Sequence, residues 1–583
     1  MNTLTLILVA FVVLAGLRAL PRLVTWVRLT GMRLRWPGVS LTGPGAFPRE
    51  LDPVWVDTSA RLHALGFHYH HAQWVEPLAA AEDPRPCMVF REPETGSYAS
   101  VYPAGTPSAG RAADVTFQTI FDDGHVIATF DDIAHLALAF PPSWDARDHN
   151  LDDLEAQWTA HRDAVLARHD HYGAVRLDPD AFVLAEEQAL AETVAYLVRE
   201  GMAAPDTATD RGLRLTTAAA WALAGSMTGG QKRLSAREMG ARKDETAAER
   251  VRPSKEARVA ALVHRFQYSR AAQGRRERSA AVDRTLFLLS AALFSLAVGW
   301  LFGWRFVPLL LVVILVHELG HLAGMALFGY QDRRILFIPF VGAAAIGSKE
   351  NATAFQRMVV LLLGPLPGLV VGLALLFHVG RPAGPLLGGG AGLEGWLFDF
   401  GITAVILNYL NLLPVMPLDG GRIVQTLFLG RFPRAQAVFL LGSGLLLAGG
   451  GVLATDVVLM ALGALTLLAV PWQWRRGTVA RLADRRAGRR TTRAEKLRVI
   501  FSILDERGGG SQNWGQLAGD VLEHLEAPRA RRATAVGGLL LYLAILLAAP
   551  VAAAIALVRD PAALLPAGEI GAVTPDSVPA GEP

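Results

Sequence analysis

The sequence predicts a polytopic α-helical membrane protein of about eight transmembrane helices, with a membrane re-entrant loop and a cytoplasmic α+β domain. Three observations lead to this fold class. Hydrophobic residues make up 52% of the 583 residues, a larger share than in a typical soluble protein. Apolar runs long enough to cross a bilayer alternate with basic clusters. Residues 36–283 contain no such run, so that region is expected to fold outside the bilayer.

The apolar runs and the arginines between them predict a topology. About eight runs are long enough to span: residues 4–20, 285–301, 306–329, 358–379, 396–418, 435–453, 456–472 and 535–558. Arginine-rich clusters follow the first run, precede residue 285 and fill residues 475–498. Because Lys and Arg are enriched on the cytoplasmic side of spans, the large soluble region is expected in the cytoplasm of a cell-membrane protein, with both termini outside.

The same pattern divides the chain into predicted parts. They are an N-terminal membrane anchor (1–35), a cytoplasmic α+β and helical domain (36–283), a membrane core (284–474), a basic cytoplasmic segment (475–534), a last transmembrane helix (535–558) and a disordered tail (559–583). We expect an anchor rather than a signal peptide because no small-residue cleavage site precedes the first arginines. The tail is rich in Pro, Ala and Gly, which predicts disorder.

The soluble region has the patterns of both strands and helices. Residues 98–102 and 115–130 are expected to form antiparallel strands, with a turn at Asp122-Asp123-Gly124. Residues 154–168 and 182–199 are predicted to form amphipathic helices, and residues 245–278 a basic helical connector.

Three histidines cluster in this region, at His68, His70 and His71. Alternation along a strand would send His70 and His71 to opposite faces, so surface histidines are a better interpretation than a metal site. Cys87 is the sole cysteine, which excludes an intrachain disulfide and a cysteine-based zinc site. The formal net charge of +3 does not indicate nucleic acid as a partner.

The pentad HELGH lies at residues 317–321, inside the apolar run 306–329. On an α-helix His317 and His321 are one turn apart on the same face, where both imidazoles can bind one metal ion. Glu318 lies about 100° round the helix from His317, where it could hold a metal-bound water. Ionisable groups inside a membrane are costly unless they are paired or coordinated, so this pentad is a candidate zinc site.

A zinc hydrolase needs a third protein ligand and an open position for water. The segment NYLNLLPVMPLDGGR, residues 408–422, offers Asp419 at the cytoplasmic end of another predicted span. The predicted topology puts Asp419 at the depth of the two histidines. Proline residues interrupt this helix, and the two glycines after Asp419 permit close backbone approach. The alternative is that Asp419 ends the helix and pairs with Arg422.

Residues 335–347, ILFIPFVGAAAIG, are apolar but too short to span, and polar residues flank them on both sides. Both flanks are expected on the same side of the membrane, so the segment should enter the membrane and return. Irregular backbone is tolerated at that depth only where protein or a wet cavity provides partners for its polar groups. An interfacial loop that plugs the helix bundle is an equally good interpretation.

In combination, HELGH at 317–321, GPLPG at 364–368 and NLLPVMPLDGG at 411–421 resemble the site-2 protease family of intramembrane zinc metalloproteases. The resemblance covers roughly residues 285–472. It implies one Zn²⁺ per chain held by His317, His321 and Asp419, with Glu318 as the catalytic base. It implies a role for Asn411 in substrate positioning or oxyanion stabilisation. It also implies a membrane-associated β element that receives the substrate as an added strand, here with Ile338, Phe340 and Gly342 as contacts.

The resemblance also implies the activity. The protein is expected to cleave single-span membrane-protein substrates in or near their transmembrane segments, within the lipid bilayer. Many family members have Asn where this chain has Gly368, so one substrate contact is expected to differ. The region 36–283 is not a PDZ or CBS module that we recognise. It is expected either to bind substrates or a cytoplasmic regulator, or to serve as a stabilising cap.

Other classes of protein remain as alternatives. A protease-like scaffold with a structural zinc site would have no use for Glu318. A zinc transporter would often show ligands in duplicated halves, and here one half carries them. A prenyl-protein-type membrane zinc protease would have a Glu as third ligand in place of Asp419.

Overall fold

The computed structural model describes most of the chain. The described residues are 22–23, 25–77, 82–104, 112–130, 140–148, 153–169, 173–206, 212–227, 253–275, 280–338, 342–349, 352–379, 392–430, 432–488, 492–507, 514–527 and 532–558. The predicted first span (4–20) and the predicted disordered tail (559–583) lie outside them, so both remain predictions.

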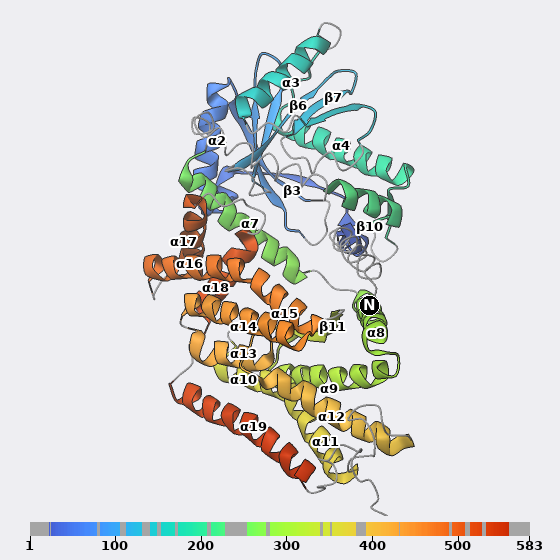
Figure 1. Cartoon of the computed structure of the whole chain (residues 1–583). Helices are drawn as coiled ribbons and strands as arrows, with labels where there is room; N and C mark the ends of the chain where they lie inside the picture. The colour runs from blue at the N-terminus through green and yellow to red at the C-terminus, as the bar shows by residue number, and fades with distance from the viewer. Residues whose placement is uncertain are drawn as a thin grey trace, which may run out of the picture. The chain divides into compact units, whose positions relative to one another are not determined.

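The chain forms two compact units (Figure 1). The first contains Met1–Ser279 together with Leu482–Leu522, and the second contains Ala280–Arg481 together with Glu523–Pro583. Each unit is therefore built from two stretches that are far apart in the sequence.

A seven-stranded sheet is the centre of the first unit, with the strand order β2-β3-β4-β5-β6-β7-β8. Neighbouring strands are antiparallel except for β7 and β8, which are parallel. The strands are β2 (Val39–Thr42), β3 (His68–Val75), β4 (Arg85–Arg91), β5 (Tyr98–Pro103), β6 (Ala113–Ile120), β7 (Val126–Phe130) and β8 (Trp144–Asp148). A second sheet has the order β1-β10-β9, from Arg33–Arg35, Gly212–Leu215 and Ala203–Pro205.

Helices pack on the large sheet around an aromatic core. Phe67, Phe90, Phe117 and Trp158 are all buried there. The helices around this core are α2 (Asp52–Ala64), α3 (Leu154–His169) and α7 (Lys255–Arg275). Helix α4 (Pro179–Arg199) packs elsewhere on the sheet, with Phe182 in a cluster with Cys87, Val89 and Tyr98. The predicted strands and amphipathic helices of this region are confirmed, and so is the helical connector over 255–275; its predicted residues 245–252 and 276–278 lie outside the described part of the chain.

The expectation that His70 and His71 face opposite sides of a strand is wrong. A β-bulge in β3 shifts the register between Tyr69 and His71, and such a bulge breaks the alternation of side chains. The two rings are adjacent, with their Nδ1 atoms 2.7 Å apart. His71 also contacts the Gln73 amide, whose nitrogen donates to Glu186 at 2.6 Å. The histidines therefore belong to a hydrogen-bonded network between β3 and α4.

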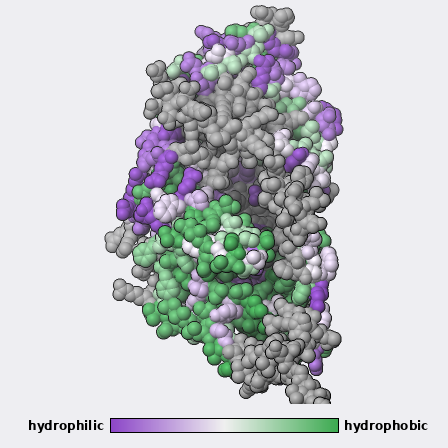
Figure 2. All heavy atoms as spheres, viewed as in Figure 1, coloured by the Kyte–Doolittle hydropathy of each residue, from purple (hydrophilic) through white to green (hydrophobic). Residues whose placement is uncertain are grey.

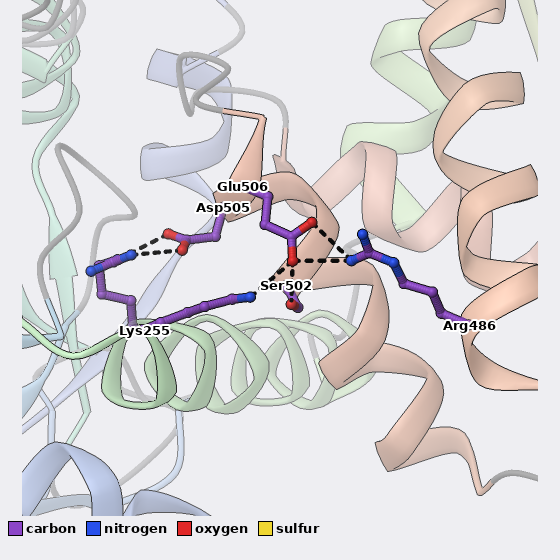
Figure 3. Close-up of polar contacts among 6 residues, drawn as sticks. Lys255, Arg486, Ser502, Asp505 and Glu506 are labelled. Carbon is purple, nitrogen blue, oxygen red and sulfur yellow. Dashed lines mark hydrogen bonds and ion pairs between the residues drawn. The ribbon is translucent and has the colours of Figure 1, made fainter.

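Residues after the predicted membrane core return to the first unit. Helix α17 (Arg493–Glu506) packs on α7, and ion pairs join the two (Figure 3). The guanidinium of Arg258 donates to both carboxylate oxygens of Asp505, at 2.9 and 2.7 Å. Glu506 bonds both Lys255 and Arg486, each at 2.8 Å, which lowers the pKa of Glu506 to about 2.

The second unit is helical. Its described part contains six helices long and apolar enough to cross a membrane: Phe306–Leu327 (α9), Ala354–Val379 (α10 and α11), Gly392–Leu412 (α12), Pro433–Ala454 (α14), Val457–Ala487 (α15 and α16) and Ala533–Ala552 (within α19, Arg532–Val558). Helix α8 (Ala280–Phe302) contains a shorter apolar stretch. A multi-pass membrane protein is supported, while the number of spans stays a prediction.

Hydrophobic side chains gather on the outer face of these helices (Figure 2). Leu453 and Leu468 keep 89% and 76% of their surface exposed. Exposed apolar surface on this scale is what a lipid-facing helix bundle requires.

A pair of antiparallel strands occupies the predicted re-entrant segment. Strand β11 (Gln331–Ile338) pairs with β12 (Gly342–Ser348), and Ile335 lies opposite Ala345. Strand β11 packs on α8 and β12 packs on α9. The segment is therefore a β element, while its entry into a membrane remains a prediction.

Helix α12 ends earlier than the predicted span, at Leu412 rather than at residue 418. Pro414 and Pro417 follow, and proline can neither donate to a helix nor follow a helical residue easily. The chain continues as a short loop, and α13 (Asp419–Val424) begins at Asp419. Within residues 413–418 Val415 is buried, while Pro414 and Pro417 are exposed.

Candidate metal centre

Helix α9 presents two histidines on one buried face. The side chains of His317 and His321 are one turn apart, with ring centroids separated by 4.8 Å. Their relative exposures are 4% and 7%, and their Nε2 atoms lie 3.1 Å apart. The helical spacing of HELGH therefore converges the two imidazoles on one point, as the sequence predicts.

Asp419 completes a set of three donors. It is the first residue of α13, and its Oδ2 lies 3.1 Å from Nε2 of His317 and 3.2 Å from Nε2 of His321. Ligands about 2.0–2.1 Å from a tetrahedral Zn²⁺ are separated from one another by about 3.3 Å. The donor set therefore fits a zinc ion in residue types and in spacing.

A hydrogen bond at Nδ1 of each imidazole determines that Nε2 faces the other donors of the set. Nδ1 of His317 lies 2.8 Å from Oδ1 of Asn408, and Nδ1 of His321 lies 2.8 Å from the carbonyl of Val360. Since both partners are acceptors, each Nδ1 carries the proton. Each Nε2 then keeps a lone pair for a metal, which is the usual arrangement of metal-binding histidines.

Asn408 is a site residue that the sequence analysis did not single out. It is fully buried in α12, and its Nδ2 donates to the carbonyl of Ala404 at 2.7 Å. That bond leaves Oδ1 as the atom that faces His317. As a polar residue inside a predicted span, Asn408 could have been identified from the sequence. The family motif begins at Asn411, one turn later, and therefore pointed to that residue instead.

Glycines provide the room for these contacts. A Cβ on Gly364 would lie 2.2 Å from Cε1 of His321, and a Cβ on Gly368 would lie 2.1 Å from Nδ2 of Asn408. At either position a larger residue would displace the side chain that it meets. At Gly368, where many members of the resembled family have Asn, the side chain of Asn408 fills the space.

Glu318 lies beside the donor set on α9. Its carboxylate is buried, and Oε2 has no hydrogen-bond partner among the described residues. The backbone N–H of Ala345 in β12 lies beside the same carboxylate. A buried carboxylate oxygen without a partner is costly, and a water molecule or a substrate group would satisfy it.

The structure describes three of the four predicted substrate-binding residues. The half-buried Asn411 donates from Nδ2 to the carbonyl of Leu407 at 3.2 Å, within its own helix. Ile338 and Gly342 lie opposite each other at the ends of the paired strands β11 and β12. Phe340 lies outside the described residues.

A buried set of two imidazoles and one carboxylate inside apolar helices could hold a metal ion. No protein-family model matches the chain. The stage IV sporulation protein FB of Bacillus subtilis is 28% identical over 129 residues, which are 22% of this chain and 42% of that protein. The zinc metalloprotease MJ0392 of Methanocaldococcus jannaschii is 27% identical over 124 residues, which are 20% of this chain and 33% of that protein. These matches support the assignment of the chain to the site-2 protease family.

Among solved structures, the site-2 protease from Methanocaldococcus jannaschii aligns with a TM-score of 0.26 and 21% sequence identity, over 32% of this chain and 88% of that chain. The chain spans less than half of the length of each of the two curated relatives.

Proposed function

We propose that the protein is an intramembrane zinc metalloprotease that cleaves peptide bonds in or near the transmembrane segments of membrane-protein substrates. The observation that carries the proposal is the convergence of His317, His321 and Asp419 at 3.1–3.2 Å, with the buried Glu318 beside them. The names of the relatives support the protease class.

The two Nε2 atoms and Oδ2 of Asp419 would hold the zinc. When bound, the metal lowers the pKa of a water molecule toward ~7 and polarises a carbonyl. Glu318 would accept the proton of that water and pass it to the leaving amine, a role that suits a carboxylate whose Oε2 has no other partner among the described residues. The burial of all four side chains excludes bulk water from the reaction.

A transmembrane substrate must unwind before it can be cut, because a helix hides its carbonyls in backbone hydrogen bonds. Strand pairing with the β11–β12 element would replace those bonds. The contact between Ala345 of β12 and Glu318 favours β12, since it would bring an added strand close to the catalytic base. Asn411 would then contact the substrate backbone after release from the Leu407 carbonyl.

The membrane placement of the parts also belongs to this proposal. The large first unit would face the cytoplasm, with both termini outside, and it would recruit substrates or a regulator there. The basic clusters that flank the spans support this orientation.

The test is Glu318→Gln in proteoliposomes that contain a set of single-span substrates. Cleavage should fall by about 10²–10⁴-fold, the usual contribution of a general base, while zinc content stays at one ion per chain. Glu394→Gln is the matched control, because Glu394 is an exposed residue in the first turn of α12. Wild-type cleavage by Glu318→Gln would remove Glu318 from the mechanism, and a zinc-free wild-type protein would remove the proposed function.

A further inference from the structure

The break between α12 and α13 leaves backbone groups that a continuous helix would pair. In an unbroken helix the carbonyl of Leu412 would accept from the N–H of residue 416. Here Met416 donates that N–H to Oγ of Ser443 at 3.1 Å. The carbonyl of Leu412 accepts instead from the hydroxyl of Tyr542 at 2.5 Å. Each end of the lost helical bond therefore has a side-chain hydroxyl as its new partner.

These two hydroxyls come from helices that carry no predicted metal ligand. Ser443 lies in the middle of α14 and is 5% exposed, and Tyr542 lies in the middle of α19 and is 2% exposed. Helix α19 packs against α10, α11 and α12. A Cβ on Gly538, one turn before Tyr542, would lie 2.7 Å from Sδ of Met358, so this glycine permits the close approach of α19.

The carbonyl that Tyr542 binds lies directly against the metal-ligand segment. A Cβ on Gly420 would be 2.1 Å from the oxygen of Leu412, and a Cβ on Gly421 would be 2.5 Å from the carbonyl carbon of Val415. These two glycines follow Asp419 in the chain. A movement of the Leu412 carbonyl would therefore push on the backbone beside the third ligand.

The loop also has its own short-range bonds, from Val415 N–H to the Leu413 carbonyl at 2.7 Å and from Leu418 N–H to the Val415 carbonyl at 3.0 Å. These bonds fold residues 413–418 into a compact turn between α12 and α13. The position of this turn relative to α9 depends in part on its contacts with other helices. The described contacts made through hydroxyls are those of Ser443 and Tyr542.

We propose that Ser443 and Tyr542 are positioning residues for the metal centre. They hold the Leu412 carbonyl at the end of α12 and the Met416 N–H within the loop 413–418, and thereby place Asp419 at bonding distance from the two histidines. Helix α19 is then a working part of the metalloprotease unit rather than a separate membrane anchor. The inference rests on the proposed function, because it assumes that Asp419 binds the zinc.

The test compares Tyr542→Phe and Ser443→Ala with the wild-type full chain in detergent micelles. Zinc affinity is measured by competition with a chelator, and ligand geometry is measured by the visible absorption of the Co²⁺-substituted protein. Each variant should bind zinc about 10-fold or more weakly, as variants of residues that support metal ligands do. Each should also change the Co²⁺ absorption bands, which loss of overall stability alone would not do.

Tyr409→Phe is the matched control. Tyr409 packs against the same hydrophobic cluster as Tyr542, but its hydroxyl has no hydrogen-bond partner among the described residues. This variant should keep the wild-type zinc affinity and absorption bands. If Tyr542→Phe does not fold, Ser443→Ala decides the question, since it removes one oxygen from a small residue.

Unchanged affinity and absorption in the folded variants would overturn the inference and leave the proposed function intact. A wild-type protein that binds neither Zn²⁺ nor Co²⁺ would instead overturn the proposed function. The two failures are therefore distinguishable without a substrate.

Discussion

Asn408 offers the sharpest test of how the metal centre is built. Replacement by leucine keeps the approximate volume of the side chain and removes the acceptor for Nδ1 of His317. The imidazole N–H, 2.8 Å from its present partner, would then be buried without an acceptor from this side chain. A buried donor without a partner costs about 1–3 kcal/mol, and the neutral ring would no longer be held in the tautomer that ligates through Nε2.

The cost should appear in metal binding. At about 1.4 kcal/mol per tenfold change in an equilibrium constant, the lost bond corresponds to roughly 5- to 150-fold weaker zinc binding. This range includes the 10- to 100-fold effect that is typical when the hydrogen-bond partner of a ligating histidine is removed. We therefore expect Asn408→Leu to bind zinc about 10- to 100-fold more weakly than the wild-type protein, measured by competition with a chelator.

Asn411→Leu is the control for this experiment. Asn411 lies one turn later on the same helix, and its described hydrogen bond is to the Leu407 carbonyl rather than to a ligand. It should keep the wild-type zinc affinity, even where cleavage falls. Equal losses of zinc affinity in the two variants, or none in Asn408→Leu, would refute the reasoning from the Nδ1 bond.

Two further predictions concern a glycine and a buried histidine. Gly364→Ala should weaken zinc binding at least tenfold in the same competition assay, since its Cβ would lie 2.2 Å from Cε1 of His321; Gly442→Ala, which meets no atom within 4 Å, should not. In the first unit, burial lowers the pKa of His161 from 6.5 to about 3, so the unfolded chain takes up a proton as the pH falls below 6.5 while the folded chain does not. Stability that is fully present above pH 6.5 should therefore be lost by about 1.4 kcal/mol per pH unit as the pH falls toward 3. The free energy of unfolding, measured by amide hydrogen exchange in β6 and β7, should fall with pH in this way in the wild-type protein but not in His161→Gln. An equal dependence on pH in both proteins would contradict the prediction.

Local patterns predicted the parts of the structure that depend on near neighbours. The four-residue spacing of His317 and His321 determines a shared helix face whatever the surroundings. The turn Asp122-Asp123-Gly124 lies between β6 and β7, where the sequence places it. The prediction of Asp419 as the third ligand rested on another observation, the matching membrane depth of two predicted spans. The structure brings it to the two histidines.

Features that depend on one inserted residue or on a tertiary contact were not predictable in the same way. The bulge at Tyr69 and His71 changes the faces of two side chains without a change in hydrophobic pattern. Asn408 and Asn411 are equally polar residues in one apolar run, and only the position of α9 shows which one bonds His317. The end of α12 at Leu412 is similar, because the prolines predict a break but the partners in α14 and α19 determine where the freed backbone groups go.

The return of the chain to the first unit has consequences for any test of that unit's role. Arg258 and Asp505 are 247 residues apart in the sequence, so no local pattern could indicate their pairing. Helix α17 buries Leu497, Ile500 and Phe501 and packs on α7. Removal of residues 36–283 alone would expose part of this apolar face to water, at about 25 cal/mol for each Å² uncovered. Altered substrate choice in such a deletion would therefore mix the loss of a recruiting domain with the misfolding of α17. A deletion that also replaces residues 482–522 by a linker separates the two effects, because α7 and α17, which pack on each other, are then removed together.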